Sequence, residues 1–324
     1  MPPPPKKQKA KNPAVTVAEF YARHAETLGL KLIGPAVGFD RWIREPTINR
    51  PGLALSGFFS YFAEKRIQVI GSAELTYLKT LGPVVMRERF QKLCAKNIPC
   101  LVFARGALIP QAILDVATKQ QVAVFMTPLV TMRFINAATI ALELDFAPTT
   151  SEHGSMVDIM GIGTMVRGAS GVGKSECVLG LIERGYSLVA DDVTRFRAIE
   201  GRDLVGTCPD LTRYHMEVRG IGVINVSSIF GVGSIRLEKR LDLVVTLQDW
   251  DELEEVDRIG LDEQYYEILG IHVPHIIIPV RMGRDLARLV EVAAMDQKLK
   301  GLGQNSAMEF NKRLLSLMEN RKNG

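Results

Sequence analysis

The sequence is short of cysteine, of long apolar runs and of excess charge. Its four cysteines are Cys94, Cys100, Cys177 and Cys208. They show no C-x-x-C spacing, so we expect reduced thiols rather than a disulfide framework. No apolar stretch approaches the ~18 residues of a membrane-spanning helix, and the beginning of the chain lacks the apolar core of a signal peptide. We therefore expect a cytoplasmic protein without membrane contact.

The net charge of +4 is concentrated at one end of the chain. Lys6, Lys7, Lys9 and Lys11 supply as many positive charges as the whole net excess, so the remainder is close to neutral. A neutral body argues against a nucleic-acid surface. The lysines follow a proline run, and we expect residues 1–14 to form a disordered, solubilising tail, with contact to an acidic partner as the alternative.

A chain of 324 residues with 47% apolar and 23% charged residues is expected to form two globular domains. The composition changes in the proline-containing run 145–151, so we predict domains at 15–147 and 148–324. The first domain begins with a capping box, Thr16 to Glu19, which opens a helix reaching toward Gly29. Strand patterns at 66–71, 100–104 and 122–126 alternate with helix patterns, which indicates a parallel α/β sheet. This half contains no catalytic motif, so we expect it to be a binding, regulatory or assembly domain.

The strongest motif is a glycine-rich run that fits G-x-x-x-x-G-K-[ST] at every fixed position. The run is Gly168, Ala169, Ser170, Gly171, Val172, Gly173, Lys174 and Ser175. A strand pattern precedes it and a helix pattern follows. Loop amides at a helix N-terminus would cradle phosphates, Lys174 would reach the β/γ-phosphates, and the Ser175 hydroxyl would bind Mg²⁺. An accidental Gly/Ser turn is the alternative, but the context predicts nucleoside-triphosphate binding.

Acidic residues and a histidine flank this loop in the sequence. Asp191 and Asp192 end a buried-strand pattern at 187–190, where a carboxylate binds a metal or accepts a proton from an attacking hydroxyl. A solvated turn is the alternative. Repulsion between adjacent carboxylates predicts a raised pKa for one of them. His153 lies just before the loop, and its spacing alone leaves its role open.

Further candidates lie downstream. Glu217 and Arg219 stand two apart in a strand pattern and so share one face, where Glu217 would bind Mg²⁺ and Arg219 phosphoryl oxygens. A surface ion-paired strand is the alternative. Arg258 ends an acidic loop, and the strand pattern at 275–280 closes on a basic segment. The candidates in that segment are Pro279, Val280, Arg281, Met282, Gly283 and Arg284.

Together these motifs resemble the bacterial HPr kinase/phosphorylase family over about residues 16–315. The matching stretches are 49–59, 66–68, 153–154, 168–176, 188–192, 217–222, 258–262, 279–281 and 290–295. The resemblance implies ATP- and Mg²⁺-dependent phosphorylation of a serine on the small phosphocarrier HPr, as a regulator of carbon metabolism. It also implies reversal, in which inorganic phosphate attacks phosphoserine and pyrophosphate is released.

The resemblance also assigns roles to positions of this sequence. It implies that Lys174 and the loop amides hold the triphosphate and that Ser175 and Glu217 bind Mg²⁺. Asp192 would take the proton of the substrate serine and return it in the reverse reaction. His153 and Arg258 match the family's other catalytic positions.

The implied fold class is an N-terminal α/β domain with a parallel sheet plus a C-terminal P-loop kinase domain resembling phosphoenolpyruvate carboxykinase, assembled as a homohexamer. A small-metabolite kinase on the same fold and a non-catalytic nucleotide-sensing switch are the alternatives. Met282 and Asp285 depart from the family stretch P-V-R-P-G-R-N. The missing proline loosens that loop, and Asp285 adds negative charge near the attacking phosphate, so both weaken the expectation of phosphorolysis more than that of kinase activity.

Overall fold

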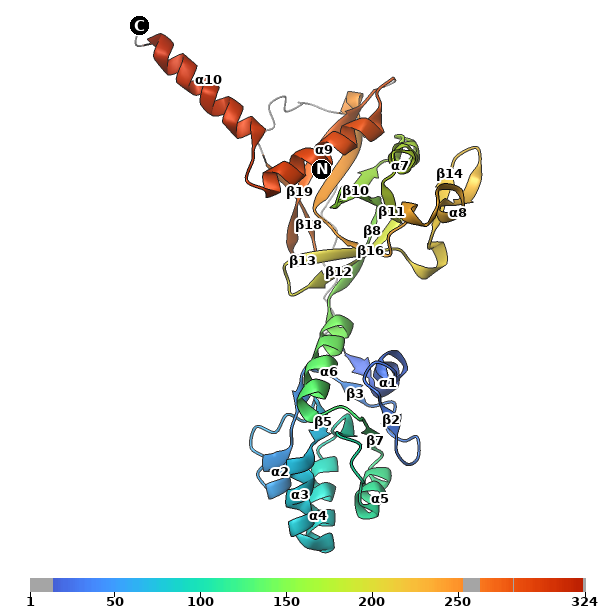
Figure 1. The fold of residues 1–324 in the computed structure, drawn as a ribbon, viewed down its shortest axis with the longest axis vertical. Helices are drawn as coiled ribbons and strands as arrows, with labels where there is room; N and C mark the ends of the chain where they lie inside the picture. The colour runs from blue at the N-terminus through green and yellow to red at the C-terminus, as the bar shows by residue number, and fades with distance from the viewer. Residues whose placement is uncertain (1–13, 253–262, 282, 323–324) are drawn as a thin grey trace. The chain divides into compact units, whose positions relative to one another are not determined.

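The computed structural model describes residues 14–252, 263–281 and 283–322 of the chain (Figure 1). Arg258, Met282 and nearly all of the predicted tail lie outside the described residues. The chain divides into two compact units, Met1–Ala147 and Pro148–Gly324. Each unit has its own layers and its own buried cores.

The first helix, α1 (Val17–His24), confirms the predicted capping box. The Thr16 hydroxyl accepts from the Glu19 N–H at 3.2 Å, and a Glu19 carboxylate oxygen accepts from the Thr16 N–H at 2.9 Å. The helix proper ends at His24, and the chain continues toward Gly29 in turns, in which the Leu28 N–H donates to the His24 carbonyl at 3.0 Å and the Leu30 N–H to the Ala25 carbonyl at 2.8 Å. Gly29 closes these turns with φ of 59°.

The first unit confirms the predicted parallel sheet, in the order β2-β7-β6-β5-β4. Strands β4 to β7 are parallel and β2 is an antiparallel edge. Val69 and Val102 face a core shared with α1 and α6, whereas Ile70 and Phe103 face the core under α2 to α5. The remaining elements of this unit are β1 (Val15–Thr16), β2 (Lys31–Leu32), β3 (Trp42–Ile43), β4 (Ile48–Asn49), α2 (Gly52–Ser56), β5 (Ile67–Ile70), α3 (Ser72–Thr80), α4 (Gly82–Cys94), β6 (Cys100–Phe103), α5 (Gln111–Lys119), β7 (Ala123–Met126) and α6 (Thr131–Phe146).

The second unit contains a six-stranded sheet, a four-stranded sheet and a hairpin. The six-stranded order is β11-β9-β10-β17-β19-β18, in which β10, β17 and β19 are parallel neighbours. Its strands are β9 (Ser155–Ile159), β10 (Ile162–Gly168), β11 (Ser187–Ala190), β17 (Leu243–Asp249), β18 (Gln264–Ile268) and β19 (Ile271–Val280). The four-stranded sheet holds β16 (Glu238–Arg240), β13 (Asp203–Thr207), β12 (Val193–Ile199) and β8 (Thr149–His153), and the hairpin pairs β14 (His215–Val218) with β15 (Gly222–Asn225). Its helices are α7 (Lys174–Glu183), α8 (Val226–Phe230), α9 (Leu286–Gly301) and α10 (Ser306–Lys322).

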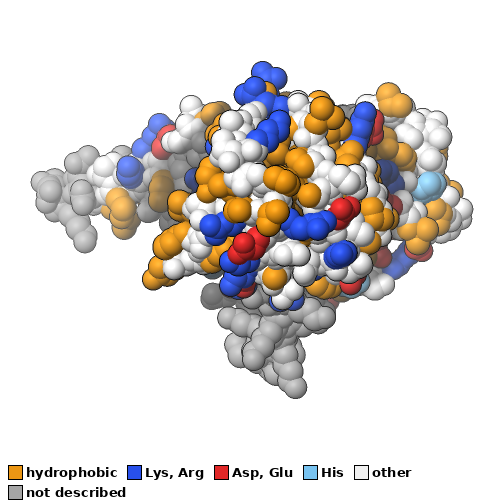
Figure 2. All heavy atoms as spheres, turned by 90° about the horizontal axis from the view of Figure 1, so that it is seen from below, with side chains coloured by type: hydrophobic (Ala, Val, Ile, Leu, Met, Phe, Trp, Pro, Cys, Tyr) orange, Lys and Arg blue, Asp and Glu red, His pale blue; other side chains and the backbone are white. Residues whose placement is uncertain are grey.

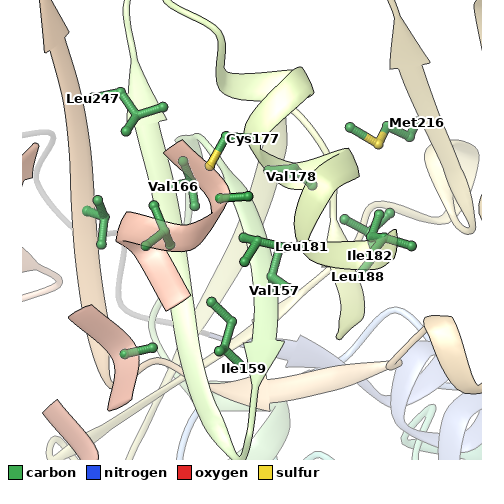
Figure 3. Close-up of a cluster of buried hydrophobic side chains, with 14 of the residues drawn as sticks. Val157, Ile159, Val166, Cys177, Val178, Leu181, Ile182, Leu188, Met216 and Leu247 are labelled. Atoms are coloured by element: carbon green, nitrogen blue, oxygen red, sulfur yellow. The ribbon is translucent and has the colours of Figure 1, made fainter. Parts of the chain in front are cut away.

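Helix α7 is anchored by an apolar face packed on the six-stranded sheet (Figure 3). Cys177, Val178 and Leu181 pack in one buried cluster with Val157 and Val166 of β9 and β10. Full burial of each aliphatic side chain contributes roughly 1.5–3 kcal/mol. The opposite face of the sheet packs on the four-stranded sheet in a separate core. The N-terminus of α7 is thereby fixed at the end of β10.

The strand register brings the ends of three parallel strands to one edge. Gly168 at the end of β10 pairs with Leu247 of β17, and Asp249 at the end of β17 pairs with Val280 of β19. Ligands of open α/β sheets bind outside the carboxyl ends of parallel strands. A ligand site is therefore expected at this edge of the sheet.

The cysteines and the helices of the described residues bear on two further predictions. All four cysteines are free, and burial raises the pKa of Cys94, Cys100 and Cys177 to about 12. Among the helices that the structure describes, none is long and apolar enough to cross a membrane. On the face drawn in Figure 2, basic and acidic side chains are interspersed among hydrophobic ones.

Candidate functional site

The glycine-rich loop joins the end of β10 to the start of α7, as predicted. Gly171 and Gly173 adopt φ of 91° and 97°, a region that glycine reaches without strain. A Cβ at Gly168 would lie 2.8 Å from the Leu247 carbonyl oxygen. The backbone can follow this course only with glycine at these positions, and the N–H groups at the start of α7 make a natural anion site.

Lys174 and Asp192 form the closest charge pair of the loop region. Lys174 Nζ lies 2.6 Å from Asp192 Oδ1, and the two side chains are 17% and 72% exposed. The hydrogen bond from Lys174 lowers the pKa of Asp192 and is the largest influence on it; burial opposes it, and the charges of Lys174 and His153 lower the pKa further. The raised pKa expected from carboxylate repulsion is therefore not found at Asp192, where the hydrogen bond from Lys174 dominates.

Asp191 is a support for the site, not a solvated turn residue. It is 8% exposed, and its Oδ1 accepts from the Ser155 hydroxyl at 2.7 Å. Its Oδ2 accepts from the Glu217 N–H at 3.1 Å. The Ser155 oxygen in turn accepts from the Asp192 N–H at 3.2 Å. One buried carboxylate thus joins β9, β11 and β14 and fixes the backbone of both Asp192 and Glu217.

His153 ends β8 and precedes Gly154, which turns the chain into β9. The Gly154 N–H donates to the Asp192 carbonyl at 2.9 Å, and the Gly154 carbonyl accepts from the Thr194 hydroxyl at 2.8 Å. A Cβ at Gly154 would lie 2.6 Å from Met165 Cε. The backbone beside His153 is therefore fixed from both sides next to Asp192.

Two clefts flank the loop and share His153 and residues 168–171. The first has a volume of ≈ 350 Å³. It is lined in addition by Gly173, Lys174, Ser175, Glu176, Asp191, Asp192, Glu217 and Arg219. The second, of ≈ 590 Å³, extends over the carboxyl end of β17 and is lined in addition by Arg167, Val172 and residues 246–249. The first cleft thus collects most of the residues predicted from the sequence.

Glu217 and Arg219 reach this cleft from the β14–β15 hairpin. Glu217 lies in β14, whereas Arg219 follows the strand's last residue, Val218, instead of lying within the strand. Both are exposed on either side of the buried Val218, as the shared face predicts. An Arg219 guanidinium nitrogen donates to the Ser170 hydroxyl at 2.9 Å, which fastens the hairpin to the loop.

The segment after β19 does not line either cleft. Pro279 and Val280 end β19, and the Arg281 guanidinium lies over the Trp250 ring at 3.6 Å from its centroid. Arg284 donates to the Pro279 carbonyl at 3.2 Å across a turn that contains Gly283 at φ of 79°. The group therefore sits at the same edge of the sheet but outside the clefts.

Asp285 has structural partners that the sequence did not predict. Its carboxylate accepts from the Arg288 N–H at 3.0 Å and caps α9, and its other oxygen lies 2.6 Å from an Arg184 nitrogen. The negative charge expected near the attacking phosphate is therefore paired with Arg184 and accepts a hydrogen bond at the start of α9.

Four residues of the site region were not predicted from the sequence. Ser155, Arg167, Thr246 and Trp250 contact or line the site, although none belongs to a short motif. The only available signal was position: Ser155 follows His153-Gly154, and Arg167 directly precedes the loop.

Replacing Ser155 with alanine is expected to destabilise the second unit by about 1–3 kcal/mol, because a buried oxygen of Asp191 loses its donor. Urea unfolding measures the loss. Ser316→Ala is the matched control, since the Ser316 hydroxyl donates to the Arg313 carbonyl on an exposed helix; a change within about 0.5 kcal/mol is expected there. Equal effects of the two substitutions would remove the support role of Ser155.

Comparison with known proteins gives matches to both units. Residues 15–142 match the family described as HPr Serine kinase N terminus, and residues 144–314 match HPr Serine kinase C-terminal domain. HPr kinase/phosphorylase 1 of Oceanobacillus iheyensis is 41% identical over 294 residues, covering 91% of this chain and 95% of that protein. HPr kinase/phosphorylase of Halalkalibacterium halodurans is 43% identical over the same shares of both chains.

A third relative, HPr kinase/phosphorylase of Leptospira biflexa, is 41% identical over 304 residues, 93% of this chain and 94% of that protein. A solved structure, the Hpr(Ser) kinase/phosphatase from Coxiella burnetii, aligns with a TM-score of 0.45 at 32% identity, covering 50% of this chain and 98% of that chain. The two family matches follow one another along almost the whole chain, in the order in which its two units occur. The chain belongs to the HPr serine kinase family.

Proposed function

We propose that the protein transfers the γ-phosphoryl group of ATP to a serine of HPr and reverses the transfer with inorganic phosphate. The observation that carries the proposal is the pairing of Lys174 with Asp192 at 2.6 Å in a cleft that also contains the loop, Ser175 and Glu217. A phosphate-binding cation and a base for a hydroxyl thus meet in one place. Family membership supports HPr as the acceptor.

In the forward reaction, the Asp192 carboxylate accepts the proton of the serine hydroxyl. The serine oxygen then bonds to the γ-phosphorus, and the bond to the β-phosphate oxygen breaks, so that ADP leaves. Lys174 and the loop N–H groups neutralise the phosphoryl oxygens throughout. His153 and Arg258 are assigned to the same centre, although Arg258 lies outside the described residues.

In the reverse reaction, an oxygen of inorganic phosphate bonds to the phosphoserine phosphorus and the serine oxygen departs. Protonated Asp192 returns its proton to that oxygen, and pyrophosphate leaves. We assign Arg281 and Arg284 to phosphate binding in this direction. The pairing of Asp285 with Arg184 supports phosphorolysis, because the carboxylate charge is already compensated.

Ser175 and Glu217 fit a Mg²⁺ ion, since both offer oxygen ligands and both line the cleft beside the loop. Mg²⁺ characteristically binds through one or two protein oxygens plus substrate phosphates, and a two-residue set matches that habit. When bound, the ion would neutralise charge on the phosphoryl oxygens. The resemblance further supports a homohexamer in the cytoplasm, and light scattering would test the assembly.

Incubation with HPr and γ-labelled ATP is expected to label one serine, and inorganic phosphate added to the phosphorylated product is expected to release pyrophosphate. Absence of label on HPr would contradict the kinase proposal. Label on a metabolite instead would favour the small-molecule kinase, and ATP binding without any transfer would favour the nucleotide-sensing switch. Labelling without pyrophosphate release would restrict the protein to the forward direction.

A further inference from the structure

Arg167 lies in β10 directly before the first loop residue, Gly168. It belongs to no motif and has no part in the proposed chemistry. It pairs in register with Thr246 of β17 and lines the ≈ 590 Å³ cleft together with His153. Its side chain is 26% exposed, so a cation is held partly out of water beside the loop. A charged group that is partly removed from water needs hydrogen-bonding or charged partners.

Those partners come from β8 of the four-stranded sheet and β18 of the six-stranded sheet. Arg167 Nε donates to the main-chain oxygen of His153 at 3.2 Å. The guanidinium lies over the Tyr266 ring of β18, 4.3 Å from the centroid. The Tyr266 hydroxyl donates to a Glu152 oxygen at 3.2 Å, and that carboxylate lies 4.0 Å from an Arg167 nitrogen. Arg167 is thus flanked by an aromatic face on one side and held by β8 on another.

The support continues behind the ring. His275 of β19 contacts Tyr266 edge-on, with ring centroids 5.7 Å apart, and its Nε2 lies 2.8 Å from the Thr246 hydroxyl. Burial, and then the charge of Arg167, lower the pKa of His275. A neutral imidazole therefore packs the ring without adding a second positive charge. The orientation of Tyr266, and hence of Arg167, is fixed by the sheet.

The geometry also explains the glycine beside His153. A Cβ at Gly154 would lie 3.0 Å from Arg167 Cγ, so the arginine stem runs directly beneath this turn. One side of the turn bonds to Asp192 and Thr194, as described above. Arg167 holds the other side by donating to His153. Loss of that donor removes one of the restraints on the end of β8, where His153 lines both clefts and pairs with Val193 of β12.

We infer that Arg167, stacked on Tyr266, is a positioning residue that holds His153 in place for phosphoryl transfer. The inference rests on the catalytic use of His153 proposed above. Arginine is suited to the role because its planar guanidinium stacks on an aromatic face and still donates sideways from Nε, which lysine cannot do. The hydrogen bonds of Lys174 and of the Glu217 N–H go to Asp192 and Asp191, so we expect nucleotide binding to depend little on Arg167.

The test compares Arg167→Lys with the wild-type protein. The substitution keeps the charge but removes the Nε donor and the flat stack, so kcat for HPr phosphorylation is expected to fall between about 10- and 100-fold through misplacement of His153. KM for ATP is expected to stay within about twofold, because Lys174 and the loop are untouched. Arg195→Lys, an exposed arginine on β12, is the control and is expected to leave kcat unchanged.

A second readout does not depend on activity. The chain has five histidines, so their Cε1–H resonances can be resolved by NMR after selective labelling and assigned with His153→Gln. Arg167→Lys is expected to shift or broaden the His153 resonance and to leave that of His24, in the other unit, unchanged. This readout tests the inference even if HPr proves not to be the acceptor.

Tyr266 provides an independent variant if Arg167→Lys folds poorly. Tyr266→Leu removes the ring and is expected to reproduce the loss of kcat, whereas Tyr266→Phe keeps the ring and is expected to remain within about threefold of wild type. Wild-type kcat and an unchanged His153 resonance in Arg167→Lys would overturn the inference. A parallel loss of ATP affinity would also overturn it, because the residue would then support the loop instead of His153.

Discussion

Replacing Lys174 with alanine is expected to reduce kcat for phosphoryl transfer by at least about 10²- to 10³-fold, the usual cost of one preorganised donor to a developing anion. Lys174 is the first residue of α7 and its ammonium reaches into the cleft, where it contacts Asp192 at 2.6 Å. The triphosphate would replace Asp192 as its partner. ATP affinity is therefore expected to fall together with kcat, and titration calorimetry beside steady-state assays measures both losses.

The loss should not arise from unfolding. Asp192 is 72% exposed, and ion pairs of this kind stabilise a fold very little. Lys92→Ala is the matched control, because it removes a lysine 2.7 Å from Glu88 on an exposed helix of the other unit; activity is expected to be unchanged there. Normal turnover of the Lys174 variant would remove the loop from the mechanism, and a large drop in its thermal midpoint would make the residue structural.

The loop could be predicted from the sequence because its chemistry and its conformation lie in consecutive residues. The glycines that permit positive φ, the lysine and the following hydroxyl are one unbroken run. The alternating strands and helices of the first unit were equally readable, since buried parallel strands are continuous apolar segments. Local pattern was sufficient in both cases.

The different roles of Asp191 and Asp192 could not be predicted from the sequence. The two residues are identical in type and adjacent in sequence, yet one carboxylate is buried against Ser155 and the other points toward Lys174. The preceding strand β11 is buried at every residue, so it shows no alternation from which the direction of either side chain follows. The backbone of Asp192 has a positive φ of 59°, a conformation that no short motif in the sequence marks.

The four-stranded sheet and the contacts of Arg167 with Tyr266 and Glu152 could not be predicted for a different reason. β8 and β16 are short and largely polar, so neither reads as a strand without its partner. Arg167 and Tyr266 are far apart in sequence and meet because β18 packs beside β19 at the sheet edge. Contacts between distant strands depend on sheet order, which a single sequence does not display.

Replacing Asp192 with asparagine is expected to lower kcat in both directions by about 10²- to 10⁴-fold, the usual contribution of a general base or acid. Asparagine tolerates the positive φ of this position as well as aspartate does, so the backbone should be retained. ATP affinity should not weaken, because Lys174 loses a competing carboxylate. Asp210→Asn, at an exposed pair with Arg213, is the control and is expected to keep full activity. Weaker ATP binding in Asp192→Asn would instead indicate a structural role.

The pH dependence follows from the same pair. In the free enzyme Lys174 lowers the pKa of Asp192, so the carboxylate stays ionised and ready to accept a proton well into the acid range. Once the triphosphate takes Lys174, that stabilisation of the ionised form is lost and the pKa of Asp192 rises. The acid limb of kcat, which reports the complex, is therefore expected at higher pH than the acid limb of kcat/KM, which reports the free enzyme. Coincident limbs would mean that Lys174 does not leave Asp192 on binding, and an acid limb that survives in Asp192→Asn would assign the base to another residue.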